Sequence, residues 1–269
     1  MRSAAPPVPG VSVAGVMTSA PRPLDVAVGT RRVPAVLWAA VDGGAPLVLL
    51  GHGGGGHKSA PRQQALARQL VAAGMSVLAI DGPAHGERAP DVASPAQYQR
   101  LLVTRGMASV VEEMVEDWTA AVHAARAAGA GDGGLGYLGM SMGTRFGIPL
   151  AASLGDGLTC AVLGKFGLVQ SAVLDPGLLD VAQVRRAAAG VTAPTLWHVQ
   201  WDDELFPLAG QLELFETLGA PDKRLVAYPG PHSARPEEAV CRWVDFLAAR
   251  LVQRPEAVDG SLNLSPALS

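Results

Sequence analysis

The pentapeptide GMSMG at residues 139–143 could carry a nucleophile. It follows the apolar run LGYLG and precedes a helical pattern, so Ser141 is expected on a sharp turn between a strand and a helix. Such a turn strains the backbone and requires small residues at both ends of the pentapeptide. It also places the serine at a helix N-terminus, which favours a developing oxyanion. An ordinary glycine-rich turn is the alternative, and the strand–turn–helix context favours the nucleophile.

The glycine-rich segment GHGGGGHK at residues 51–58 could supply backbone N–H groups to a ligand. A phosphate-binding loop requires GxxxxGK[ST], but here a histidine separates the last glycine from the lysine, so the order fails. An oxyanion loop of the HGGG type fits better. We expect Gly54 to be one oxyanion donor, with Gly53 or Gly55 next in order, and the amide of Met142 to be the other.

An acid and a base follow the last two apolar runs of the chain. Residues 194–199 lead into QWDDELFP, and residues 224–228 lead into PGPHSA. A serine hydroxyl needs an adjacent base, and the base needs a carboxylate that fixes its tautomer. His232 is the only histidine after the acidic pair, so it is the candidate base. The residues alone leave Asp202 and Asp203 open as the acid.

Short apolar runs alternate with longer amphipathic ones between residues 46 and 251. The runs are typical of parallel strands that are buried on both faces. They cover residues 46–51, 76–81, 135–139, 159–164, 194–199 and 224–228. Residues 24–30 and 33–41 indicate an antiparallel pair before them. We therefore predict an α/β three-layer sandwich with a mostly parallel sheet and flanking helices, whose active residues lie at the carboxyl ends of the strands.

Two helices show an apolar face at helical spacing. One face comprises Val240, Trp243, Val244, Leu247 and Leu251, and the other comprises Val111, Met114, Trp118 and Val122. The carboxylates on the second helix are expected to face water rather than to bind metal. They are Glu112, Glu113, Glu116 and Asp117.

The composition excludes several classes of function. The formal net charge of -3 provides no basic field for nucleic acid. Cys160 and Cys241 are too few for a disulfide framework, and both are expected as buried free thiols. No apolar run approaches the roughly 20 residues that span a bilayer, and prolines interrupt the N-terminus where a signal peptide needs an apolar helix. We expect a cytoplasmic protein that binds neither nucleic acid nor membrane. A homo-oligomer is compatible with the sequence.

The chain is expected to form one domain. Residues 1–22 are rich in Pro, Ala and Ser and predict an irregular lead-in, whereas residues 253–269 lack periodicity and predict a loose tail. The single domain then covers residues 23–252. Two insertions, at about residues 88–110 and 164–192, are expected to reach over Ser141 as small cap elements.

These segments together resemble the α/β-hydrolase superfamily, and within it the dienelactone hydrolases and related esterases. The resemblance covers residues 46–251. The family's acid loop commonly reads GxxDxxVP, and aligning Phe206-Pro207 on its Val-Pro places the acid at Asp203, with Gln200 where Gly is usual. That departure keeps Asp202 as the minor alternative.

Two further departures concern the base and the nucleophile. The segment PGPH is one residue shorter than the family's PGxxH, which weakens the support for His232. Dienelactone hydrolases carry Cys at the nucleophile position, whereas Ser141 points to the esterases. The segment IDGPAHGER resembles the family's D-x-x-G-H-G loop, which implies that Asp81 and His85 shape the wall of the site.

The remaining histidines and aromatic residues are expected in different places. His198 lies within a predicted strand and is expected in the core, while His52 is expected to bond the backbone of the glycine loop. We expect substrate contacts from Gly53, Gly55, His57 and Phe166. For His57 and Lys58, a solvated position on the loop is an equal alternative to contact with a polar end of the substrate. No ligand spacing such as HExxH or CxxC and no dinucleotide motif is present, so neither a metal nor another cofactor is expected.

The sequence therefore predicts a serine hydrolase that cleaves small or medium-sized carboxylic esters through an acyl-enzyme. In this hypothesis His232 takes the proton of Ser141 and Asp203 orients the imidazole. Because fold does not dictate reaction, the alternatives are a lyase, cyclase or acyltransferase acting on a biosynthetic intermediate, a peptidase, and a binding protein that retains a hydrolase scaffold. A water-poor cavity and weak turnover of simple esters would distinguish the lyase, cyclase and acyltransferase group.

Overall fold

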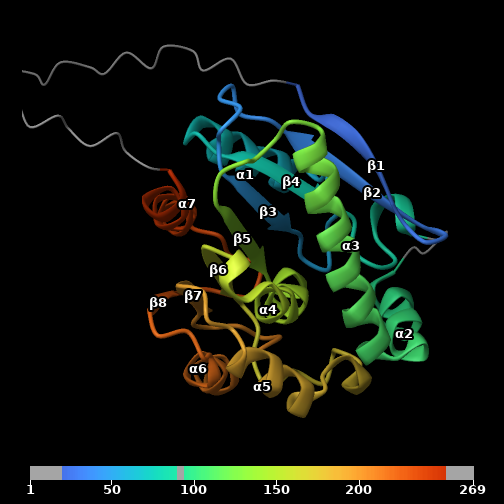
Figure 1. The fold of residues 1–269 in the computed structure, drawn as a ribbon. Coiled ribbons are helices and arrows are strands. Elements are labelled where there is room, and N and C mark those ends of the chain that lie inside the picture. Colours follow the sequence, from blue (N-terminus) through green and yellow to red (C-terminus); the bar gives the residue numbers. More distant parts are fainter. Residues whose placement is uncertain (1–19, 90–93, 253–269) are drawn as a thin grey trace, which may run out of the picture.

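The apolar runs form one sheet of eight strands in the computed structural model, which describes residues 20–89 and 94–252 (Figure 1). The strands are β1 (Arg22–Val28), β2 (Arg31–Trp38), β3 (Leu47–Gly51), β4 (Ser76–Ile80), β5 (Leu135–Met140), β6 (Cys160–Gly164), β7 (Thr195–Gln200) and β8 (Lys223–Tyr228). Their order in the sheet is β1-β2-β4-β3-β5-β6-β7-β8. β2 pairs antiparallel with β1 and with β4, and all other pairs are parallel. The predicted fold class is confirmed.

Helices cover both faces of the sheet and make the outer two layers (Figure 1). The α-helices are α1 (Pro61–Ala72), α2 (Pro95–Arg105), α3 (Met107–Ala127), α4 (Met142–Leu154), α5 (Val181–Ala189), α6 (Leu208–Thr217) and α7 (Glu237–Leu251). Short 3₁₀ turns are η1 (Gly86–Arg88), η2 (Gly155–Gly157) and η3 (Pro176–Leu178). Among the described residues, no helix combines the length and apolarity that crossing a bilayer requires.

Alternate residues of each central strand belong to different halves of the core. In β3, Leu47 and Leu49 face the layer that contains α3 and α4, whereas Val48 and Leu50 face α1 and α7. All four side chains are fully buried. The strand is thus apolar along its whole length because successive side chains point to opposite faces and helices cover both.

The lead-in and the tail fall mostly outside the described residues. Of the predicted lead-in, residues 20–22 are described and Arg22 already begins β1; the predicted tail, residues 253–269, lies outside. The first insertion contains α2 and the start of α3, and the second contains η3 and α5. The two insertions meet, because the backbone N–H of Asp175 donates a hydrogen bond of 2.8 Å to Gln99 Oε1. We call the two together the cap.

One expectation for α3 is wrong. Asp117 was expected to face water, but its side chain is fully buried. It accepts a hydrogen bond of 2.8 Å from Arg31 Nε and one of 2.7 Å from Arg88. Two guanidinium groups compensate the burial of the carboxylate, and both belong to segments that are distant in sequence.

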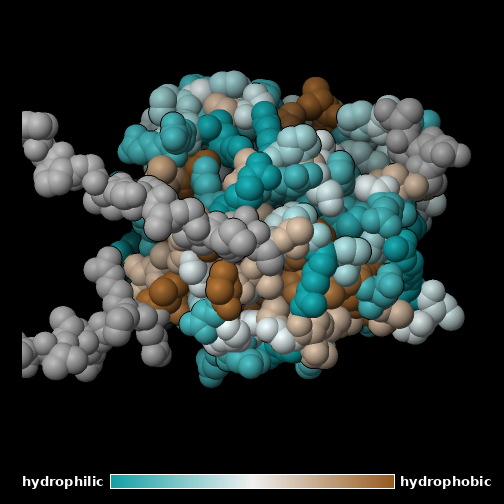
Figure 2. Space-filling model, turned by 90° about the horizontal axis from the view of Figure 1, so that it is seen from above, coloured by the Kyte–Doolittle hydropathy of each residue, from teal (hydrophilic) through white to brown (hydrophobic). Residues whose placement is uncertain are grey.

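The expectation for the two cysteines is half right. Both are free thiols, and Cys160 is buried in β6, but Cys241 is exposed on α7. Large apolar side chains that reach the surface, such as Val41, Val173 and Trp201, are spread over separate segments. On the face in Figure 2, hydrophobic residues form several patches that hydrophilic residues separate.

His198 is a core residue of β7, as predicted, and it is fully buried. Its ring stacks on Tyr228 and meets Trp243 edge-on, with centroid distances of 5.2 and 5.3 Å. Nε2 lies 3.2 Å from Gln200 Oε1, while Nδ1 has no hydrogen-bond partner among the described residues. Burial lowers the pKa of His198 to about 4, because a proton on Nδ1 would be buried without an acceptor.

We predict that His198 makes the protein less stable as the pH falls from about 6.5 to about 4. In that window the unfolded chain binds a proton that the folded chain excludes, so the free energy of unfolding decreases by up to about 3 kcal/mol. In His198→Gln this contribution is absent. Urea unfolding at several pH values should therefore give a shallower dependence on pH for the variant. Equal slopes for both proteins would contradict the prediction.

Candidate active site

Ser141 lies on the sharp turn between β5 and α4. Its backbone angles are φ 59° and ψ −117°, a conformation that residues other than glycine rarely adopt. Its N–H donates to the carbonyl of Gly164 at the end of β6, at 3.0 Å. A Cβ placed on Gly139 would lie 2.8 Å from the carbonyl carbon of Gly143. Close packing across the turn therefore requires Gly139, and a Cβ on Gly143 would lie 3.0 Å from the carbonyl oxygen of Gly51 at the end of β3.

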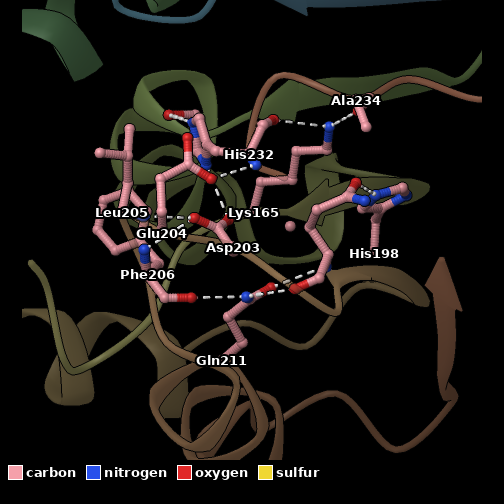
Figure 3. Close-up of polar contacts among 12 residues, drawn as sticks. Lys165, His198, Asp203, Glu204, Leu205, Phe206, Gln211, His232 and Ala234 are labelled. Atoms are coloured by element: carbon pink, nitrogen blue, oxygen red, sulfur yellow. Dashed lines mark hydrogen bonds and ion pairs between the residues drawn. The ribbon is translucent and has the colours of Figure 1, made fainter. Parts of the chain in front are cut away.

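His232 connects Ser141 to Asp203. Its Nε2 lies 2.9 Å from Ser141 Oγ, and its Nδ1 lies 2.7 Å from Asp203 Oδ2. The other oxygen of Asp203 accepts hydrogen bonds from the N–H groups of Leu205 and Phe206, each at 2.8 Å (Figure 3). The structure thus brings the three predicted residues into one hydrogen-bonded chain from three loops.

The geometry distinguishes the two aspartates. Asp202 is exposed, and its Oδ2 accepts a hydrogen bond of 2.8 Å from the N–H of Gly230. It therefore closes the loop before His232 but does not contact the imidazole. Asp203 is buried and directed at that ring.

Sequence reasoning missed two residues that hold the loop of His232. Gln200 was noted only as a departure from glycine, but its amide nitrogen lies 2.7 Å from the carbonyl oxygen of Pro229 and 2.9 Å from that of Gly230. Lys165 donates from Nζ to the carbonyls of His232 and Ala234 (Figure 3). Burial lowers the pKa of Lys165 to about 8. The sequence did contain a signal for Lys165, because a lysine directly follows the apolar strand β6.

The glycine loop forms a turn in which two histidines orient the peptides. The N–H of Gly56 donates to the carbonyl of Gly53 at 3.0 Å, so Gly54 and Gly55 occupy the apex. His52 Nε2 accepts from the N–H of Gly82, so its Nδ1 carries the proton and donates to the carbonyl of Gly53 at 2.9 Å. Because the C=O and N–H of a trans peptide point in opposite directions, this bond directs the N–H of Gly54 away from His52.

The two histidines of that network have structural roles, as expected. Burial lowers the pKa of His52 to about 4, so its ring is neutral at neutral pH and Nε2 remains an acceptor. His85 Nε2 lies 2.9 Å from the carbonyl oxygen of Gly54, and its Nδ1 lies 2.8 Å from that of Pro83. Both rings therefore hold the loop through its backbone.

Two expected substrate contacts are not supported by their placement. His57 is exposed and lines neither of the hollows at Ser141; its Nδ1 accepts from the N–H of Ser59 at 3.3 Å. Phe166 is fully buried and packs against Phe206, with ring centroids 4.9 Å apart. Phe206, not Phe166, lines the cavity.

A buried ion pair fixes the glycine loop to the end of β4. Lys58 Nζ lies 2.7 Å from Asp81 Oδ2, and it also contacts Glu87. Burial alone would raise the pKa of Asp81, but hydrogen bonds from Lys58 and from the N–H of Glu87 offset this and hold the pKa below its usual value. Gly86 has φ +52°, and a Cβ there would lie 2.4 Å from the Asp81 carboxylate. Lys58 is thus structural, although a solvated position was also compatible with the sequence.

Two hollows meet at Ser141 and His232. The first, the cap cavity, has a volume of about 340 Å³ and lies between the glycine loop and the cap. Its lining comprises Gly54, Gly55, Pro95, Tyr98, Gln99, Leu102, Ser141, Met142, Arg145, Val173, Leu174, Leu178, Leu205, Phe206 and His232. The second, the open cleft, has a volume of about 580 Å³, with Gly53, Arg62 and Arg235 in its wall. Within the described residues, no group of three or more His, Cys, Asp or Glu side chains could hold a metal ion.

Comparison with known proteins places the chain in a family. No family model and no curated protein matches the sequence. Among solved structures, a cold-adapted esterase from an Arctic intertidal metagenomic library, in its PEG-bound complex, is 36% identical, with a TM-score of 0.71. The match covers 86% of this chain and 93% of that chain. The chain belongs to the α/β-hydrolase superfamily. The same similarity places this α/β hydrolase in the esterase branch, as the sequence predicted.

A more distant structure shares the fold of this α/β hydrolase. The dienelactone hydrolase from Anabaena variabilis ATCC 29413 is 22% identical, with a TM-score of 0.59, and the match covers 86% of this chain and 96% of that chain. At this identity the likeness concerns the arrangement of strands and helices.

We predict that Lys58→Met lowers the free energy of unfolding by about 3–5 kcal/mol, because it leaves a buried carboxylate without its cation. Asp81→Asn should also destabilise the protein, and the double variant should lose less than the sum of the two single losses. Urea unfolding at pH 7 measures all three. Arg224→Met is the control, because it removes an exposed ion pair with Asp222 and should have little effect. Additive losses would contradict the coupling.

Proposed function

We propose that this α/β hydrolase cleaves carboxylic esters of small or medium size through an acyl-enzyme on Ser141. The observation that carries the proposal is the hydrogen-bonded chain from Ser141 through His232 to Asp203, which opens onto the cap cavity. The proposed partner is a small-molecule ester, and the reaction requires neither nucleic acid nor a membrane surface.

In the first step, Ser141 Oγ attacks the ester carbonyl while His232 Nε2 takes the hydroxyl proton. Asp203 stabilises the resulting imidazolium and accepts its Nδ1–H. The carbonyl oxygen becomes an oxyanion, for which the amides of Gly54 and Met142 are the proposed donors. Met142 is the first residue of α4, so its N–H has no acceptor within the helix. The amide of Gly54 is oriented by the bond between His52 and Gly53.

The second half of the reaction returns the proton. The tetrahedral species collapses, the alcohol leaves with the proton from His232, and the acyl group stays on Ser141. A water molecule then attacks the acyl carbonyl as His232 accepts one of its protons, and the acid leaves. Ser141 regains its hydrogen from His232, so the enzyme is unchanged.

The cap cavity supports the proposed substrate size. Its volume of about 340 Å³ is at the lower end of the range for ligand cavities, roughly 300–1,000 Å³. Apolar side chains such as Leu174, Leu178 and Phe206 make up much of its wall. Gly53 and Gly55 are retained as proposed substrate contacts, since both line the hollows at Ser141.

We predict that the native protein hydrolyses p-nitrophenyl esters with short to medium acyl chains and that Ser141→Ala lowers kcat/KM by on the order of 10⁴-fold or more. The initial rates of a series from acetate to decanoate measure both. A fluorophosphonate probe should label the native protein and not the variant. If the folded native protein neither turns over an ester nor reacts with the probe, the proposal is wrong. Labelling without turnover would favour the lyase, cyclase or acyltransferase alternative.

A second prediction separates the two aspartates. Asp203→Asn should lower kcat by about 10³–10⁴-fold, because the imidazole loses its orienting carboxylate. Asp202→Asn is the matched control, and kcat should change by less than about tenfold because this side chain contacts only the loop backbone. Steady-state kinetics on the best ester of the series provide the comparison. The assignment of Asp203 fails if Asp202→Asn has the larger effect.

A further inference from the structure

Arg145 is a buried cation in the wall of the cap cavity. It lies on α4 one turn after Ser141, and its N–H donates to the carbonyl of Ser141 at 3.0 Å. Its side chain lines the same cavity as Ser141 and His232, and the residue is only 9% exposed. The mechanism above gives this charge no role.

The guanidinium has no counterion in the described part of the chain. It forms none of the ion pairs found there, and one of its nitrogens donates to the carbonyl of Leu178 in the cap. The central carbon of the guanidinium, Cζ, lies 5.2 Å from the centre of the Phe166 ring, which is a cation–π contact. A guanidinium has five N–H donors, so most of them remain for a ligand. Burial lowers the pKa of Arg145 to about 10, which leaves the group charged at neutral pH.

A buried charge without a partner is costly, and the contrast within this protein is clear. The buried Asp117 is paired with two arginines, and the buried Asp81 is paired with Lys58. Among the described residues, no acidic side chain lines the cap cavity. Arg145 is thus a buried charge in a cavity whose described walls supply no counterion, beside the candidate nucleophile.

The rest of the cavity fits a short apolar chain that ends in an anion. Leu102, Leu174 and Leu178 supply apolar surface, while the Tyr98 hydroxyl and Gln99 amide add neutral polar groups. Ser141 and Arg145 are four residues apart, a rise of roughly 6 Å along the helix axis. Because both residues line one cavity of about 340 Å³, a short chain would join an ester carbonyl at Ser141 to an anion at Arg145.

We propose that Arg145 binds a carboxylate of the substrate, so that the preferred substrates are short esters that carry a carboxylate group, such as hemiesters of dicarboxylic acids. The inference rests on the proposed ester hydrolysis and specifies its substrate class. A guanidinium binds a carboxylate through two parallel hydrogen bonds, which also orient the chain.

The cations of the open cleft are weaker candidates for this role. Lys165 Nζ already donates to the carbonyls of His232 and Ala234. Arg62 is exposed to solvent, and Arg235 is only partly buried. Water can compensate the charge of these two groups, whereas Arg145 lies inside the protein.

The test is a comparison of charged and neutral esters of equal length. Hydrolysis of monoethyl succinate, glutarate and adipate is followed by pH-stat titration, against ethyl esters of the uncharged monocarboxylic acids of matched length. A second arm compares 4-acetoxybutanoate with butyl acetate, which places the carboxylate on the alcohol side. The measured quantity is the ratio of kcat/KM for the charged ester to kcat/KM for the neutral one.

For the native protein the ratio should exceed about ten at one chain length in one of the two arms. Arg145→Met should lower this ratio by about 10- to 100-fold, the range expected for the loss of hydrogen bonds to a charged group. Arg145→Lys should retain part of it. Arg185→Met is the matched control, because Arg185 lies on the surface of α5 in an exposed ion pair with Glu213, and its ratio should equal that of the native protein.

Binding without turnover separates this inference from the proposed function. In Ser141→Ala, monoethyl adipate or glutarate should raise the Tm, and adding Arg145→Met should abolish the rise even if no ester is ever hydrolysed. If Arg145→Met and Arg145→Lys slow charged and neutral esters by the same factor, Arg145 is structural and the inference is overturned. It is also overturned if the native ratio is one or less in both arms, or if the preference survives in Arg145→Met.

Discussion

The reversal of the chain at Ser141 is the constraint on which the other parts of the site depend. A non-glycine residue in this conformation costs about 1–3 kcal/mol, so the surrounding packing must hold it. The Thr144 side chain does so from within α4, because its hydroxyl oxygen accepts from the N–H of Gly164 at 2.8 Å and lies 2.8 Å from the carbonyl oxygen of Gly139. These bonds join the ends of β5 and β6 to the first turn of α4. The same turn consequently fixes the positions of the serine hydroxyl, the Met142 amide and the N-terminus of α4.

The position of the imidazole depends on a second set of buried polar groups. The loop that carries His232 is one residue shorter than the family segment it resembles, and the acid loop has Gln200 in place of the usual glycine. The Gln200 amide contacts the carbonyls of the shorter loop, and Gln211 in turn accepts from the Gln200 N–H at 3.1 Å. The glutamine thus bridges the strand that leads to Asp203 and the loop that leads to His232. The two departures from the family pattern occur at residues that touch.

The features that could be predicted from sequence are those with a local cause. A strand buried on both faces is apolar throughout, and a nucleophile turn needs glycines at fixed spacing, so the sheet and the place of Ser141 follow from short segments. The surroundings of a buried charge do not, because they depend on residues from elsewhere in the chain. Asp117 was wrongly expected in water since its partners Arg31 and Arg88 are 86 and 29 residues away.

The predicted substrate contacts of Phe166 and His57 were not supported for a related reason. Which of Phe166 and Phe206 reaches the cavity depends on tertiary packing, and no periodic pattern in residues 164–192 encodes this. His57 belongs to a loop whose peptides are held by hydrogen bonds to His52 and His85. The residues next to His57 in the sequence therefore do not indicate which way its side chain faces. Both errors concern the direction of a side chain on a segment whose location was right.

The charged and the apolar walls of the cap cavity come from different elements. The helix α4 begins at the strained turn, so the position of Arg145 relative to Ser141 is set by helical geometry and does not change with the cap. The cap supplies Leu174 and Leu178, which limit the length and width of the cavity, and it contacts the guanidinium through the carbonyl of Leu178 and the ring of Phe166. A different cap sequence would thus change the size of the substrate that fits, while Arg145 on α4 keeps its position relative to Ser141. If Arg145 selects for a carboxylate, size and charge preference are encoded on separate elements and can vary independently.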